Sequence, residues 1–240
     1  MTPTILATCG GWRPHDWHDL EFSPLQRYAL DLTGVTGRRI RMAFVATAGG
    51  DQRHEETRGL TAAADAGVDA RYIRFFGRNE PDLDAVLDDV DLVWVEGGSV
   101  VNLLAVWRAH GFDGALRRAW ERGVVLAGTS AGALCWHAGG PTSSFGPGLA
   151  SVTDALGFIP ESLAVHYDSQ PRRRPLYHDD VAAGVLPPGH GIDEGVGLLY
   201  RGTDLVEVLA ESDGAAWRVE SDGSGGAAEH RITPRRLPER

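Results

Sequence analysis

The chain has 240 residues, a net charge of −10 at pH 7 and an apolar fraction of 42%, which predict a soluble globular protein with a sizeable core. The acidic balance and the lack of a long basic block argue against nucleic acid or an anionic membrane surface as a partner. Cys9 and Cys135 lie in apolar runs, as is typical of buried free thiols in a reducing compartment. Residues Met1–Leu6 lack the features of a signal peptide, so we expect a cytoplasmic protein without a membrane partner.

Short apolar runs alternate with helix-compatible segments through the first half of the chain. The runs span Thr4–Thr8, Ile40–Thr47, Asp69–Phe75, Leu92–Val95 and Val124–Ala127. The helix-compatible segments span Gln52–Ala66, Asp82–Asp88, Val100–His110 and Gly114–Arg122. The runs are nearly continuous, as expected for strands that are covered on both faces. This alternation predicts a three-layer α/β domain with a mostly parallel central sheet and right-handed crossovers.

The second half of the chain has a different pattern. Two segments have the composition of loops: Gly139–Gly148 and Asp168–Tyr177. Antiparallel strands are expected toward the C-terminus, at Val196–Arg201, Leu205–Ala210 and Ala215–Val219. Residues 221–240 are rich in Gly, Ser, Arg and Pro, which predicts a flexible C-terminal tail after a single domain over residues 1–220.

The strongest local signal is the Gly-Thr-Ser-Ala-Gly turn at residues 128–132. It follows an apolar run and precedes a helix-compatible segment, which is the context of a G-x-S-x-G nucleophile elbow. A serine in so sharp a turn projects its hydroxyl above the sheet, and the flanking glycines avoid collisions with neighbouring backbone. We therefore interpret Ser130 as a nucleophile and the N–H of Ala131 as a donor to a developing oxyanion. The alternative is an ordinary turn with a capping serine.

A second glycine turn, Glu96–Ser99, ends the run Leu92–Val95. It has neither the G-x-G-x-x-G spacing nor the Gly-Lys-Ser/Thr of a phosphate-binding loop. Both glycine turns follow strands of the predicted parallel sheet, and binding sites form at the carboxyl ends of such strands. The N–H of Gly98 is therefore predicted to be a second oxyanion donor.

The motifs resemble those of the S51 serine peptidases, a family that contains dipeptidase E (aspartyl dipeptidase) and cyanophycinase. The matching segments are residues 96–100, 128–133, 144–147, 165–168 and 191–198. The resemblance extends over roughly residues 1–220, which it implies are one S51 peptidase-like catalytic domain. It also implies a fold similar to that of class I glutamine amidotransferases.

The resemblance implies a Ser-His-Glu type of triad. In this chain Ser130 matches the nucleophile, His166 the general base and Glu194 the acid that orients the base. The backbone N–H groups of Gly98 and Ala131 match the oxyanion hole.

Two positions depart from the family pattern. The glycine loop usually reads Gly-Gly-Gly-Asn-Thr, whereas this chain has Glu96-Gly97-Gly98-Ser99-Val100. The loop after the serine often carries an aspartate, whereas this chain has Ser143 or Ser144. The second departure bears on substrate specificity.

Nine histidines compete for the role of base, and His166 is preferred because it ends a short apolar strand. The acid that completes the triad stays open among three residues: Glu194, Asp193 and Asp168. Ser130 with Asp168 and His190 would instead have the chain order of an α/β-hydrolase esterase. Which histidine lies near the serine distinguishes these alternatives.

Arg172, Arg173 and Arg174 form a basic cluster. They are either a solvated loop or the source of a bidentate contact to a substrate carboxylate, which an Asp-X dipeptidase would need. The sequence has no H-E-x-x-H or Cys-x-x-Cys motif, and acyl transfer to serine needs neither metal nor cofactor, so none is expected.

We therefore expect a serine exopeptidase that hydrolyses short peptides, with Asp-X dipeptides as candidate substrates. One alternative is a cyanophycinase-like hydrolase of β-aspartyl dipeptides. Another is a non-catalytic amidotransferase-like domain that binds a small ligand or a partner. A homodimer is compatible with the sequence, which leaves the oligomeric state open.

Overall fold

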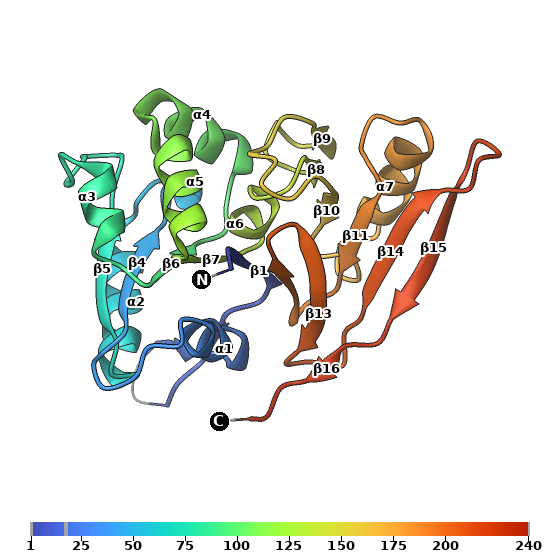
Figure 1. The fold of residues 1–240 in the computed structure, drawn as a ribbon. Coiled ribbons are helices and arrows are strands. Elements are labelled where there is room, and N and C mark those ends of the chain that lie inside the picture. Colours follow the sequence, from blue (N-terminus) through green and yellow to red (C-terminus); the bar gives the residue numbers. More distant parts are fainter. Residues whose placement is uncertain (1, 17–18, 240) are drawn as a thin grey trace.

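A computed structural model describes residues 2–16 and 19–239, and its centre is an eight-stranded sheet of order β16-β13-β12-β1-β7-β6-β4-β5 (Figure 1). Five neighbouring strands are parallel: β1 (Thr4–Cys9), β7 (Val125–Thr129), β6 (Leu92–Val95), β4 (Arg41–Val45) and β5 (Asp69–Ile73). They confirm the five strands predicted from apolar runs. Three more strands extend the sheet beyond β1: β12 (Val196–Arg201), β13 (Asp204–Ala210) and β16 (Arg235–Arg236). β12 is antiparallel to β1 and to β13, as predicted for the C-terminal strands.

Helices cover both faces of the central sheet and give the three expected layers (Figure 1). One face packs against α3 (Leu83–Asp88), α4 (Val100–His110), α5 (Phe112–Arg122) and α6 (Ala131–Leu134). The opposite face packs against α1 (Pro24–Leu32) and α2 (Arg53–Asp65), and a short 3₁₀ turn, η1 (Thr47–Gly49), follows β4. No helix within the described residues is long and apolar enough to cross a bilayer.

The strand β6 shows why the apolar runs are continuous. Val93 and Val95 pack in the core beside α4 and α5, whereas Leu92 and Trp94 pack in the core beside α1 and α2. All four side chains are fully buried. Successive side chains of a strand point to opposite faces, so a strand covered on both sides needs an apolar residue at every position.

A second, four-stranded sheet stands beside the first (Figure 1). Its order is β10 (Ser162–Ala164), β11 (Gly189–Ile192), β14 (Ala216–Ser221) and β15 (Ala227–Ile232). Helix α7 (Arg173–Ala182) packs on it through the buried Tyr177 and Val181. Residues 193–195 connect β11 to β12 and so join the two sheets.

Several segments differ from the sequence predictions. The expected loop Asp168–Tyr177 becomes α7 from Arg173 onward, because Pro175 lies in the first helical turn, where proline is tolerated. The expected loop Gly139–Gly148 contains β8 (Gly140–Thr142), which pairs with β9 (Ala150–Val152). The predicted strand at residues 215–219 forms as β14 but joins the second sheet. A short hairpin of β2 (Trp12–Arg13) and β3 (Glu21–Phe22) was not predicted.

The expected flexible tail at residues 221–240 is also wrong for the described residues up to 239. The Gly- and Ser-rich stretch forms only the turn of the β14–β15 hairpin, in which Asp222 accepts hydrogen bonds from the N–H groups of Ser224 and Gly226. After this turn, β15 pairs along β14, and β16 with the buried Leu237 returns to the central sheet. Composition alone does not reveal these long-range pairings.

Glu229 anchors the C-terminal hairpin to α7, so its replacement tests whether the C-terminal residues are part of the fold. Its carboxylate accepts hydrogen bonds from Tyr167 Oη at 2.6 Å, Arg174 Nε at 3.0 Å and His178 Nε2 at 2.9 Å. We expect Glu229→Ala to lower the free energy of unfolding by about 2–3 kcal/mol, because the substitution leaves these donors without their shared acceptor. Urea unfolding followed by circular dichroism measures this. The exposed neighbour His230 is the control, and His230→Ala should change the stability by less than about 0.5 kcal/mol. Equal stability of the two variants would contradict a folded C-terminus.

Candidate active site

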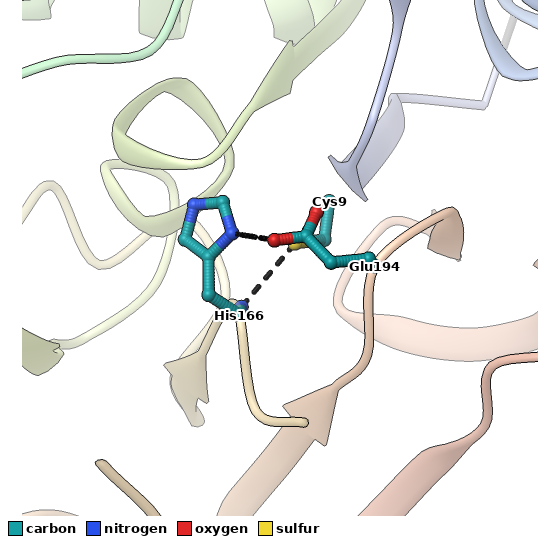
Figure 2. Close-up of side chains that lie close together, drawn as sticks. All are labelled: Cys9, His166 and Glu194. Atoms are coloured by element: carbon teal, nitrogen blue, oxygen red, sulfur yellow. Dashed lines mark hydrogen bonds and ion pairs between the residues drawn. The ribbon is translucent and has the colours of Figure 1, made fainter. Parts of the chain in front are cut away.

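Ser130, His166 and Glu194 meet where the two sheets adjoin. Ser130 follows β7, His166 follows β10, and Glu194 lies in the turn between β11 and β12. Ser130 Oγ is 2.8 Å from His166 Nε2. His166 Nδ1 is in turn hydrogen-bonded to Glu194 Oε1, as Figure 2 shows. The structure therefore brings together the three residues that the sequence motifs singled out.

The turn around Ser130 is strained and tightly packed. Ser130 has φ 54° and ψ −113°, a backbone conformation that non-glycine residues rarely adopt. Its N–H donates to Thr8 O of the neighbouring strand at 3.0 Å, which helps to hold the turn. A Cβ at Gly128 would overlap the carbonyl of Gly132, and a Cβ at Gly132 would overlap the carbonyl of Val95. Close packing thus explains both glycines of the motif.

The second glycine loop passes beside the serine. A Cβ added at Gly97 would lie 3.3 Å from Ser130 Cβ. Gly98 has φ 140°, and a Cβ there would overlap the carbonyl of Ala48. The neighbouring N–H of Ser99 donates to the same carbonyl at 2.9 Å, which fixes the loop against η1. The backbone at Gly98 and the backbone at Ala48 therefore lie too close together for any residue with a side chain at position 98.

The hydrogen bonds of Glu194 set the tautomer of His166. A carboxylate only accepts hydrogen bonds, so Nδ1 carries the proton and the lone pair of Nε2 faces the Ser130 hydroxyl. Glu194 Oε1 also accepts from Ser169 Oγ at 3.0 Å, and the Glu194 N–H donates to Asp168 Oδ1 at 3.0 Å. The hydrogen bond from His166, together with the smaller contributions of Cys9 and Ser169, lowers the pKa of Glu194 to about 2. The group is therefore ionised at neutral pH.

Cys9, at the end of β1, is a member of this cluster that the sequence analysis did not identify (Figure 2). The backbone N–H of His166 donates to Cys9 Sγ at 3.2 Å, and the thiol donates to Glu194 Oε2 at 3.3 Å. Burial, and then the charge of Glu194, raise the pKa of the Cys9 thiol, so it stays protonated. His166 has φ 55°, and the Cys9 contact helps to hold this unusual conformation.

Cys9, His166 and Glu194 are also residue types that commonly bind metal ions. One ligand atom each from Cys9, His166 and Glu194 lies within 4.8 Å of the others. These are the residues that could hold a metal ion here. Each atom, however, already takes part in a hydrogen bond within the trio, and a protonated thiol is a poor ligand. Hydrogen bonding accounts for the arrangement.

The other candidate bases and acids lie in different environments. His190 Nδ1 is 3.2 Å from Glu161, so the esterase arrangement of Ser130 with His190 does not form. Asp193 accepts hydrogen bonds from the N–H of Ala215 at 2.9 Å and from Trp217 Nε1 at 3.2 Å. Asp168 supports the backbone of Glu194 rather than the histidine ring. Of the three acids considered, Glu194 is the one that is hydrogen-bonded to His166 Nδ1.

The three arginines have different surroundings. Arg173 is buried and donates to the carbonyl of Val165, directly before His166. Arg174 pairs with Glu229 and lies 4.4 Å from the ring centroid of Trp217. Both guanidinium groups therefore already make contacts within the protein. Arg172 is exposed and lines a cavity of about 430 Å³ that also contains Ser169, the hydrogen-bond donor to Glu194.

The fold and the Ser-His-Glu cluster define an α/β protein with a serine at a strand-to-helix elbow. The family model of peptidase family S51 matches residues 18–208. The chain is 36% identical over 199 residues to the uncharacterized peptidase YgaJ of Bacillus subtilis, covering 82% of this chain and 83% of that protein. It is 30% identical over 219 residues to peptidase E of Streptomyces coelicolor, covering 85% of this chain and 79% of that protein. This chain belongs to peptidase family S51.

Two solved structures share the fold. A peptidase from an acI-B1 actinobacterium aligns with a TM-score of 0.69 at 19% identity, covering 98% of this chain and 95% of that one. A putative peptidase E from Listeria monocytogenes aligns with a TM-score of 0.60 at 14% identity, covering 97% of this chain and all of that one. These similarities confirm the predicted α/β fold, and the family assignment supports a peptidase.

The packing around the elbow predicts different effects for alanine at two helical glycines. We expect Gly132→Ala to lower the free energy of unfolding by about 1–3 kcal/mol, because the added Cβ overlaps the Val95 carbonyl. The matched control is Gly114→Ala in α5, where the nearest atom to the new Cβ is the flexible Arg118 side chain. Alanine is the better helix former, so this control should keep the stability or raise it by up to about 1 kcal/mol. Thermal unfolding of both variants measures the difference, and equal stabilities would contradict the packing argument.

Proposed function

We propose that this protein is a serine-type peptidase that hydrolyses short peptides through an acyl-enzyme. The observation that carries the proposal is the 2.8 Å contact of Ser130 Oγ with His166 Nε2, with Glu194 on the other ring nitrogen. The family assignment supports the same reaction class. A serine hydroxyl is a weak nucleophile until an adjacent base accepts its proton, and this geometry supplies that base.

In the proposed mechanism, His166 takes the Ser130 proton as the hydroxyl attacks the scissile carbonyl. Glu194 stabilises the imidazolium that forms, and it holds the ring in the tautomer that presents Nε2. The imidazolium then protonates the leaving amine, and water repeats the sequence on the acyl-enzyme. No cofactor enters these steps.

We assign the oxyanion hole to the N–H groups of Ala131 and Gly98. Ala131 is the first residue of α6, and the first N–H groups of a helix have no partner within it. Because α6 has only four residues, the N–H groups rather than a helix dipole supply the stabilisation. The glycine loop supports the assignment of Gly98, since its neighbour Gly97 packs beside Ser130.

The substrate proposed is a dipeptide or another short peptide, with an N-terminal aspartate as the favoured case. The exposed Arg172 in its cavity supports this choice, because a guanidinium binds a carboxylate in a bidentate manner. The similarity to a protein named peptidase E is a second support. β-Aspartyl dipeptides are the alternative substrate, since they present a carboxylate as well.

We also propose that the protein acts in the cytoplasm. Cys9 and Cys135 are both buried and unpaired with each other. Free thiols are typical of proteins in reducing compartments.

The first test is hydrolysis of a dipeptide panel: Asp-Leu, Ala-Leu, Glu-Leu and β-Asp-Arg. We expect wild type to release amino acids from Asp-Leu. Ser130→Ala should lower kcat by at least about 10³-fold, because the nucleophile is removed. Ser224→Ala, in the exposed β14–β15 turn, is the control and should retain wild-type activity. Release of amino acids only from β-Asp-Arg would favour the alternative substrate. No release from any peptide by folded wild type would refute the peptidase proposal.

The pKa of Glu194 gives a second prediction, which concerns pH. Its folded pKa of about 2 is below the ordinary value of 4.5, so the carboxylate is charged across pH 4–9 and does not titrate there. Glu194 itself should therefore add no acidic limb to the pH profile of kcat over this range. Glu194→Gln should lower kcat on the plateau of the profile roughly 10²–10⁴-fold, because the imidazolium of His166 loses its negative partner. The pH profile of kcat for wild type and variant measures this.

The neighbouring acid Asp193 is the matched control, since the carboxylate that Asp193→Asn changes is hydrogen-bonded to Ala215 and Trp217 and not to His166. Its kcat should stay within a few-fold of wild type. A large loss in Asp193→Asn with little loss in Glu194→Gln would show that the acid has been assigned to the wrong residue.

A further inference from the structure

A second cavity, of about 230 Å³, lies beside the glycine loop. It is lined by residues from four segments of the chain: Trp12, Gly49, Gln52, Glu55, Glu96 and Gly97. Gly97 also packs against the nucleophile, since a Cβ added there would lie 3.3 Å from Ser130 Cβ. Gly97 therefore belongs both to the wall of this cavity and to the packing around Ser130. Its size suits one amino-acid group rather than a whole peptide.

Glu96 is the unusual residue of this cavity. Its Oε2 accepts a hydrogen bond from Trp12 Nε1 at 3.1 Å. Its Oε1 is buried and has no hydrogen-bond partner among the described residues. The indole N–H of Trp94 is likewise buried without a partner, and it lies near enough to lower the pKa of Glu96. Burial has the larger, opposite effect, and the charge of Glu55 adds to it, so the pKa of Glu96 is raised to about 7.

No cation compensates this carboxylate within the part of the chain that the structure describes. The nearby Glu55 has its own partners, His54 at 3.0 Å and Arg58 at 3.1 Å. Among the described residues, the N–H groups that act on the Glu96 carboxylate are the indoles of Trp12 and Trp94. A buried carboxylate without a countercharge is costly, and a cation that enters the cavity would relieve that cost.

We propose that this cavity is a subsite for a cationic group of the substrate, an ammonium or a guanidinium, with Glu96 as its countercharge. The inference rests on the proposed peptidase function and adds to it the charge that the substrate carries. The ion pair would form in a partly enclosed cavity, where it is stronger than on an open surface. Trp12 would close one wall and hold Glu96 in place through its N–H.

Two sources of the cation fit this chemistry. One is the α-ammonium of the peptide, which would make Glu96 the residue that requires a free N-terminus. The other is a basic side chain. The cavity that contains Arg172 carries the opposite charge, so the two cavities offer countercharges of opposite sign.

A purely structural role for Glu96 makes a different prediction. If the residue serves only to accept from Trp12, glutamine would replace it without loss, because its carbonyl oxygen accepts the same bond. Glu96→Gln therefore removes the charge and keeps the size and the acceptor. A loss of affinity confined to cationic ligands would not follow from the structural role.

The test is calorimetric binding in a Ser130→Ala background, which prevents turnover. Three probes are compared: Asp-Leu, N-acetyl-Asp-Leu and N-acetyl-argininamide. Adding Glu96→Gln should weaken binding of at least one cationic probe about 10-fold or more, and leave N-acetyl-Asp-Leu unchanged. Loss for Asp-Leu identifies the α-ammonium as the cation, and loss for N-acetyl-argininamide identifies a basic side chain. Glu121→Gln, an exposed residue of α5, controls for the change of net charge.

Three results would overturn the subsite. They are equal affinities with and without Glu96→Gln, an equal loss for all three probes, and no binding of either cationic probe to the Ser130→Ala protein. Because binding is measured without hydrolysis, the result is independent of whether wild type cleaves peptides. Failure of the proposed function would appear instead as inactive wild type in the dipeptide panel.

Discussion

The 2.8 Å contact between Ser130 Oγ and His166 Nε2 joins two separate sheets, and the chemistry proposed for this protein depends on it. Ser130 belongs to the central sheet, whereas His166 belongs to the second sheet through β10. The turn at residues 193–195 connects the sheets and carries Glu194, whose carboxylate is hydrogen-bonded to His166. Anything that shifts one sheet against the other would separate Ser130 from His166.

Backbone strain is concentrated at this junction. Ser130 and His166 both have positive φ, and each is held by a neighbour from another segment: Thr8 for the serine and Cys9 for the histidine. Thr8 and Cys9 are consecutive residues at the end of β1, which lies between β7 and β12 in the central sheet. One strand end thus supports both Ser130 and His166. Positive φ at non-glycine residues persists only where surrounding contacts impose it, and it is common at functional sites.

Local patterns in the sequence predicted the central strands and the position of Ser130. Continuous apolar runs predicted the five parallel strands, because both faces of the sheet are covered, and the G-x-S-x-G turn predicted the position of Ser130. Contacts that depend on long-range pairing were not predictable. Cys9 reads as a buried thiol until β1 is placed beside β7, and the partner of Arg174 is known only once β15 pairs with β14. Glu96 differs from the family pattern in sequence, but only the folded chain shows that its Oε1 is buried without a partner.

Trapping the acyl-enzyme tests the central claim most directly. Wild type would be mixed with a dipeptide p-nitroanilide that it cleaves and quenched in acid during turnover, and the modified residue would be located by mass spectrometry of a digest. The account predicts an acyl group on the fragment that contains Ser130. An acyl group on another side chain, the neighbouring thiol of Cys9 included, would contradict it.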